Sequence, residues 1–137
     1  MTRKEAREQA FALLFEKTFS DSTIEEIIEN AVIGRELEID SYAKKLVETT
    51  LSHMGEIDTV IEPNLRKWSK NRISRVALTA LRCAVCEMVY DHEIPVSVSI
   101  NEAVELTKKF STKEDSSFVN GVLGSVAKTL PAESDKE

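Results

Sequence analysis

Residues 74–90 read SRVALTALRCAVCEMVY, and this stretch decides the fold. Its apolar residues occur on almost every side of a helix instead of forming one stripe along it. A helix with that pattern is normally buried on almost every side. We therefore expect a central helix that begins at Ser74 or Arg75 and ends at Tyr90, before a turn over residues 91–95 that contains a proline.

Three segments before this helix have the 3.6-residue periodicity of amphipathic helices. Apolar residues recur three and four positions apart over residues 3–18 and again over residues 21–34, where Gly34 ends the pattern. The same periodicity runs through residues 40–61, with Gly55 in its second half. Because glycine weakens a helix, we expect two helices in this third segment, divided at Gly55.

Two further helices are expected after the central one. Residues 96–100 alternate between apolar and polar, which is typical of a strand. Because no partner strand occurs elsewhere, we interpret them as an extended lead into a helix capped near Ser97 or Ser99. The last helix is expected to begin after a cap at Asp115 or Ser116 and to stop before a proline.

The chain has 137 residues, of which 42% are hydrophobic and 31% charged, and this suits one domain around a single core. We predict an all-α fold, a compact bundle of about seven helices over residues 1–131. Residues 132–137 are small or charged, and we expect a frayed tail. No stretch has the roughly 18 apolar residues of a membrane span or a signal-peptide core, so a cytoplasmic protein is expected.

Charge is distributed unevenly along the chain, whose net charge is -6. Residues 18–62 carry eleven acids and three bases, whereas residues 63–82 carry six bases and no acid. This asymmetry fits a face that meets an anion or an acidic partner. It fits equally well two segments that neutralise each other across the fold, so the role of the basic segment from Arg66 to Arg82 stays open.

Arg3, Lys4 and Arg7 recur at helical spacing at the start of the first helix. Positive charges at a helix N-terminus oppose the helix dipole and cost on the order of a few tenths of a kcal/mol each. A functional use of these charges, such as contact with an anion, would explain why they occur there.

Cys83 and Cys86 form a CxxC motif, and His53 and His92 complete a set of two cysteines and two histidines. Such a set can hold zinc, and CxxC motifs can also be redox-active. A redox-active pair lies at an exposed helix N-terminus, whereas these cysteines lie inside an apolar helix. We therefore interpret them as core residues. P-loop, GxSxG and GxGxxG motifs do not occur, so we predict no catalytic residue, cofactor or metal ion.

Two other groups of residues have both a structural and a functional interpretation. Glu36, Glu38 and Asp40 could pair for acid–base chemistry, but acids among apolar residues usually form a solvated face. Gly121 and Gly124 lie inside the last helix, where each costs about 1 kcal/mol relative to alanine. They predict the close approach of a neighbouring helix or of a ligand.

Basic and aromatic residues lie close together in the C-terminal third, at Lys108, Lys109, Phe110 and Phe118. Single-stranded RNA is commonly held by bases stacked on aromatic rings beside a cationic groove. The periodicity alone favours the core for both rings.

Several motifs resemble those of the NusB family of bacterial transcription antitermination factors. They form an ordered set over residues 72–130, and residues 18–62 fit the family only by their helical pattern. The motifs are LRCAVCEM (81–88), Ile94–Pro95, INEAVEL (100–106), Lys109–Phe110 and FVNGVL (118–123). The opening RKEAR (3–7) also resembles the family's basic N-terminus.

The resemblance implies an all-helical fold of two subdomains that binds the boxA element of nascent ribosomal RNA leaders. It implies that the small ribosomal-subunit protein NusE binds with it, and that the complex joins RNA polymerase. By position, the basic opening matches RNA-contacting residues, and the two rings match positions that border the RNA and are partly exposed. With the two adjacent lysines, the predicted RNA-binding residues are Arg3, Lys4, Arg7, Lys108, Lys109, Phe110 and Phe118.

Ala77 and Arg82 are the predicted NusE-binding residues. The family often has an acidic residue where this chain has Ala77, so the resemblance implies a weaker or differently built partner contact. Glu5 interrupts the basic opening and Ser117 stands where a lysine is common, so we expect modest RNA affinity in the absence of the partner.

Three alternative functions remain. The acidic total charge and Ala77 favour a helical protein-interaction module without direct RNA binding. The same type of domain also occurs fused to ribosomal RNA methyltransferases, although this chain has no cofactor-binding glycine loop. The third alternative is a redox protein that uses Cys83 and Cys86.

Overall fold

The computed structural model of the chain describes residues 1–35, 38–65 and 73–131. In these residues the backbone forms seven α-helices, one short 3-10 helix and no strand, which confirms the predicted all-α fold. The elements are α1 (Arg3–Lys17), α2 (Ile24–Arg35), α3 (Ser41–Ser52), α4 (Met54–Ile61), η1 (Glu62–Asn64), α5 (Arg75–Tyr90), α6 (Val96–Phe110) and α7 (Lys113–Thr129). None of these helices has both the length and the apolar character needed to cross a lipid bilayer. The tail predicted to be frayed lies outside the described residues.

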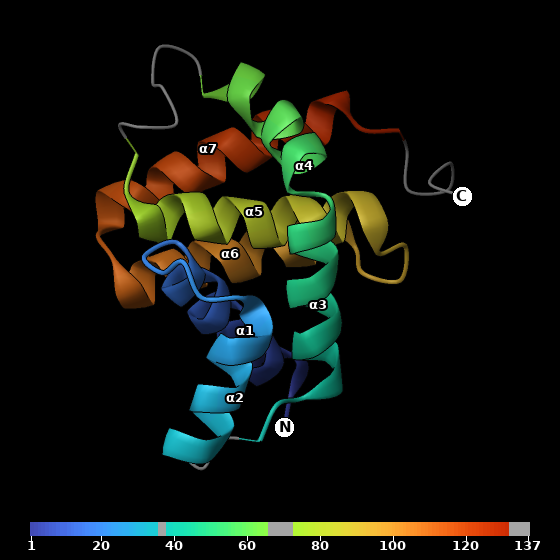
Figure 1. Cartoon of the computed structure of the whole chain (residues 1–137). Coiled ribbons are helices and arrows are strands. Elements are labelled where there is room, and N and C mark those ends of the chain that lie inside the picture. Colours follow the sequence, from blue (N-terminus) through green and yellow to red (C-terminus); the bar gives the residue numbers. More distant parts are fainter. Residues whose placement is uncertain (36–37, 66–72, 132–137) are drawn as a thin grey trace.

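Helix α5 lies at the centre of the fold and packs against α1, α3, α4, α6 and α7 (Figure 1). Its side chains at Leu81, Val85 and Met88 are completely buried. Burial of a side chain of this size stabilises the fold by about 1.5–3 kcal/mol. The prediction of a central helix from the all-round apolar pattern is therefore confirmed.

Helices α3 and α4 confirm that residues 40–61 form two helices, but the break is not where we predicted it. Asp40 caps α3, because its carboxylate accepts hydrogen bonds from the backbone N–H groups of Tyr42 and Ala43. The break falls at His53, whose φ of -114° and ψ of 20° leave the helical region. Gly55 lies in the first turn of α4 and interrupts nothing.

We expected residues 96–100 to be extended, but they form the start of helix α6. The helix begins at Val96, directly after Pro95, whose ring holds φ at -60° at the N-cap position. A five-residue alternation is too short to distinguish a strand from a helix, and a proline before it favours the start of a helix. Ser99 is therefore inside the helix and is buried, instead of capping it.

Helix α7 begins at Lys113, earlier than predicted, because Thr112 accepts the hydrogen bond from the backbone N–H of Asp115 at 3.0 Å. Asp115 instead lies in the first turn, where a carboxylate is favourable. The predicted close approach of a neighbouring helix at Gly121 and Gly124 is wrong, while the close approach of a ligand stays a prediction. Among the residues that the structure describes, a Cβ atom at either position would meet no atom of another element within 4 Å, and these residues give no packing reason for the glycines.

Candidate nucleic-acid interface

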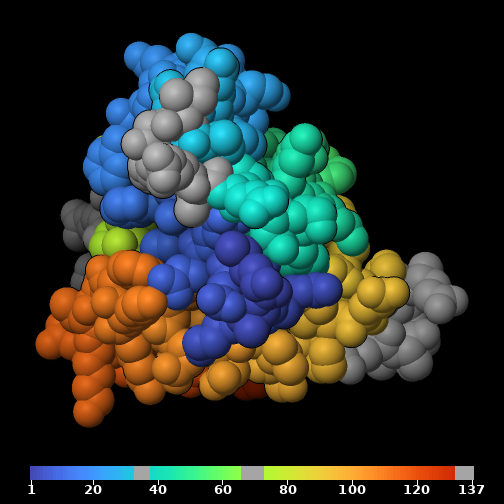
Figure 2. Space-filling view, turned by 90° about the horizontal axis from the view of Figure 1, so that it is seen from below, coloured from blue at the N-terminus to red at the C-terminus, as the bar shows by residue number. Residues whose placement is uncertain are grey.

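The first turns of α1 lie beside α6, and together they form a surface that we call the α1–α6 face (Figure 2). Three contacts join the helices. Lys4 Nζ lies 3.5 Å from Glu102 Oε2, Lys109 Nζ lies 2.7 Å from Glu8 Oε1, and the ring of Phe110 stacks on Phe11 with centroids 5.4 Å apart. The face is hollowed by a pocket of about 140 Å³, lined by Lys4, Glu8, Glu102, Glu105, Leu106 and Lys109. Lys4, Lys109 and Phe110, predicted from opposite ends of the sequence, thus share one surface.

A capping box fixes the start of α1. Glu5 N–H donates to Thr2 Oγ1 at 3.1 Å, and Thr2 N–H donates to Glu5 Oε1 at 2.9 Å. These hydrogen bonds lower the pKa of Glu5, with the backbone donor of Thr2 as the largest cause. The acid that interrupts the basic opening therefore has a structural role, and it leaves Arg3 and Lys4 on an exposed first turn.

Arg3 is exposed and lies over an aromatic ring that we did not predict as part of the site. Its guanidinium carbon is 3.8 Å from the ring centroid of Tyr42 at the start of α3, which is a cation–π contact. The two residues are far apart in the sequence, and periodicity contains no signal that would pair them. The ring restricts where the guanidinium group can lie at the end of α1.

Arg7 was predicted to bind RNA, but its charge is directed into the core. Its Nε donates to Glu87 Oε2 at 2.7 Å, and the two side chains are only 8% and 3% exposed. Arg7 precedes Ala10 and Phe11 by three and four residues, so it lies on the stripe of α1 that faces the core. In this structure Arg7 is not available to a strand lying on the surface.

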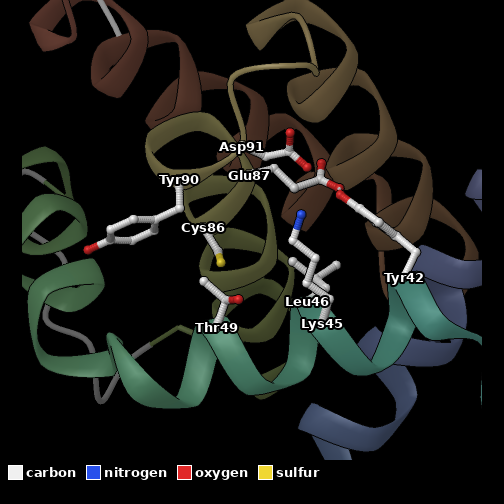
Figure 3. Close-up of a pocket in the computed structure, with 8 residues that line it drawn as sticks. All are labelled: Tyr42, Lys45, Leu46, Thr49, Cys86, Glu87, Tyr90 and Asp91. Atoms are coloured by element: carbon white, nitrogen blue, oxygen red, sulfur yellow. The ribbon is translucent and has the colours of Figure 1, made fainter. Parts of the chain in front are cut away.

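Glu87 accepts hydrogen bonds from three helices. In addition to Arg7 of α1, the hydroxyl of Tyr42 on α3 donates to Oε2, and Ser99 Oγ on α6 donates to Oε1 at 2.9 Å. Figure 3 shows the Tyr42 hydroxyl pointing at this carboxylate across the α3–α5 interface. Burial, followed by the hydrogen bond to Glu87, raises the pKa of Tyr42. The phenol therefore stays protonated and keeps donating near neutral pH.

The two predicted rings differ in exposure. Phe110 is 45% exposed at the C-terminal end of α6, whereas Phe118 on α7 is half-buried and packs against the core. Both are partly exposed, as the resemblance implied and the periodicity did not. Lys108 is exposed, and its Nζ lies 3.7 Å from Oε1 of Glu105 on the same helix.

A row of four stacked or edge-on rings extends from Phe110 along α1. Centroids are 5.4 Å apart from Phe110 to Phe11, 5.9 Å from Phe11 to Phe15, and 5.0 Å from Phe15 to Phe19. The far ring, Phe19, is 62% exposed, and the guanidinium of Arg75 lies 4.2 Å from its centroid. Phe19 was not among the predicted site residues, and it forms a second exposed aromatic end.

The predicted partner residues do not present the surface that we expected. Ala77 is completely buried in α5. Arg82 is mostly buried, and its Nε and Nη2 atoms donate to the two carboxylate oxygens of Asp58 on α4, each at 2.9 Å. Arg82 therefore fastens α4 to α5. Of the basic segment, residues 66–72 lie outside the described residues, and Arg75 is exposed.

Cys83 and Cys86 are free and buried, as predicted. Burial raises the pKa of Cys83, and it raises the pKa of Cys86 to about 11. Among the described residues, no three histidine, cysteine or acidic side chains are grouped as metal ligands would be. The acids weighed for acid–base chemistry include Asp40, which is the cap of α3, and Glu36, which lies outside the described residues.

We expect both thiols to resist a thiol-specific reagent in the folded protein at mildly alkaline pH and to react fully in urea. Only the thiolate reacts, and both burial and the raised pKa values suppress it. The measurement is the time course of reagent absorbance. A Ser97→Cys variant, with a thiol on the exposed first turn of α6, gives the rate of an accessible cysteine. A native rate for Cys83 or Cys86 equal to that of the variant would contradict the prediction.

Comparison with known proteins adds an independent finding. The family model described as "NusB family" matches residues 4–128. A "Transcription antitermination protein NusB" from Listeria monocytogenes serotype 4b is 41% identical over 127 residues, which cover 93% of this chain and 97% of the relative. The protein of the same name from Exiguobacterium sp. is 43% identical over 128 residues and covers 93% and 98%.

Two solved structures resemble the fold closely. A T. maritima NusB structure has a TM-score of 0.86 and 32% identity, and the match covers 98% of this chain and 96% of that one. A structure described as antitermination factors NusB and NusE in complex with dsRNA has a TM-score of 0.83 and 31% identity, with coverage of 93% and 97%.

Proposed function

Since the chain belongs to the NusB family, we propose that it is a transcription antitermination factor that binds boxA-type RNA together with NusE. In this role it joins an RNA polymerase antitermination complex in the cytoplasm. It acts by binding and not by catalysis, and it uses no cofactor.

The α1–α6 face is the observation that carries the proposal. This face brings together the exposed residues Lys4, Lys109 and Phe110. Arg3 adds a further exposed positive charge at the N-terminal end of α1. Cations beside an exposed ring suit a single RNA strand, because phosphates pair with the ammonium groups while a base stacks on the ring. Arg7 supports this surface from below and does not contact phosphate.

The partner binds near the start of α5 in this proposal, through exposed residues that neighbour Ala77. Arg75 and the 62% exposed ring of Phe19 present a cationic and an apolar group side by side. Ala77 is buried and Arg82 is held by Asp58 of α4, so neither side chain itself contacts the partner in this proposal. A partner bound here would lie at the end of the aromatic row opposite Phe110.

Titration of labelled boxA RNA, with and without NusE, tests the proposal by gel shift. We expect weak binding by the chain alone and clearly tighter binding to boxA when NusE is present, since binding free energies of the two ligands are coupled. A scrambled strand and an RNA duplex are the controls. Equal binding of boxA and scrambled RNA with NusE present would favour the alternative of a protein-interaction module without an RNA site.

A further inference from the structure

Each lysine of the α1–α6 face is paired with a glutamate. Lys109 Nζ is 2.7 Å from Glu8 Oε1, and Lys4 Nζ is 3.5 Å from Glu102 Oε2. Both pairs join α1 to α6, in opposite directions: the lysine belongs to α1 in one pair and to α6 in the other. The ammonium groups proposed to bind phosphate are therefore already held by carboxylates.

In both pairs the acid is more buried than the lysine. The side chain of Glu8 is 33% exposed and that of Glu102 is 19% exposed, whereas both lysines are more than half exposed. Both acids and both lysines line the hollow between the helices, and the acids are its less exposed members. When a phosphate pairs with one of these lysines, the lysine leaves its glutamate. The half-buried carboxylate then lies unpaired next to the negative charge of the phosphate.

We propose that Glu8 and Glu102 set the RNA affinity of the chain by competing with phosphate for Lys109 and Lys4. This inference rests on the proposed function and deepens it. The competition keeps binding weak until the second protein adds its own contacts. The acids thereby act as specificity residues, because the chain binds RNA tightly only when the partner is bound as well.

The test uses Glu8→Gln and Glu102→Gln, which keep the side-chain shape and remove the charge. We expect each to tighten boxA binding about two- to fivefold at near-physiological salt. The upper figure corresponds to about 1 kcal/mol, the usual limit for an exposed ion pair. The double variant should show about the product of the two gains. A gain of affinity cannot arise from unfolding, so the result stands even if a variant is slightly less stable.

Glu29→Gln on α2 is the matched control, because it changes the net charge by the same amount at an exposed position. At physiological ionic strength, charges farther apart than about 8 Å are largely screened. We expect no change in affinity for this variant. Equal gains from Glu29→Gln and Glu8→Gln would contradict the inference, since they would reflect total charge alone.

A double-mutant cycle with Lys109→Met separates competition from simple repulsion. If Glu8 acts by holding Lys109, Glu8→Gln should tighten binding in the wild-type background and have little effect in the Lys109→Met background. The same gain in both backgrounds would overturn the inference, because Glu8 would then repel RNA without reference to the lysine.

All titrations are done with NusE present and with NusE absent, on the full chain. If the wild type binds boxA and the Glu→Gln variants bind it no more tightly, this inference is overturned and the proposed function stands. Failure of the wild type and of every variant to prefer boxA would overturn both.

Discussion

Glu87→Ala should lower the free energy of unfolding by about 3–5 kcal/mol, the usual result of breaking a buried ion pair by removing one partner. The carboxylate accepts from Arg7, Tyr42 and Ser99, so its loss removes a contact that α5 makes with each of α1, α3 and α6. It also leaves the Arg7 charge buried without a partner, which is the larger part of the cost. Urea denaturation followed by far-UV circular dichroism measures the change.

Two companion variants show whether the lost stability comes from the stranded charge. Glu87→Gln keeps one acceptor oxygen, which can face either Tyr42 or Ser99 but not both, so it should still cost less than Glu87→Ala. Arg7→Met combined with Glu87→Met replaces the whole pair by apolar groups and should recover most of the stability, since such replacements are often neutral or stabilising. A loss below about 1 kcal/mol for Glu87→Ala would place the Arg7 charge in water and refute the buried pair.

Replacing Arg3, Lys4 and Lys109 together by alanine should reduce boxA affinity about 100-fold near 0.1 M salt. Each phosphate contact on a single strand contributes roughly -0.7 to the slope of log K against log salt. Loss of three contacts should therefore make that slope less steep by about 2. Fluorescence anisotropy titrations at several salt concentrations, with NusE present, give both quantities.

Lys44→Ala combined with Lys128→Ala is the control for this variant, because both lysines are exposed on other parts of the molecule. We expect the salt slope to stay as in the wild type. Arg7 is left unchanged, since its replacement would test stability and not RNA contact. An unaltered slope in the triple variant would remove Arg3, Lys4 and Lys109 from the RNA site.

The helical fold could be predicted because the decisive patterns are local. The all-round apolar pattern of residues 74–90 identifies a buried helix without any knowledge of its neighbours. Helix starts were less predictable where several capping residues occur in a row. Residues 111–117 offer serine, threonine and aspartate as caps, and only the three-dimensional packing selects Thr112.

The site could be predicted as a collection of charged and aromatic residues, but not as an arrangement. The decisive pairings join residues far apart in the chain, 80 positions for Arg7 with Glu87 and 101 for Glu8 with Lys109. Periodicity carries no information about such contacts. One local signal was available, because the spacing of Arg7 from Ala10 and Phe11 marks it as a residue on the core side of α1.

Helix α1 supplies exposed cations and core residues from the same few turns. Ala6, Ala10 and Phe11 are at most 3% exposed, and α1 packs on both α3 and α5. Truncating the amino terminus to strip the basic opening would therefore open a cavity against α5 and strand Glu87 without its counter-ion. Loss of RNA binding by such a shortened chain would report damage to the scaffold, so single side-chain replacements are the informative way to dissect this end of the molecule.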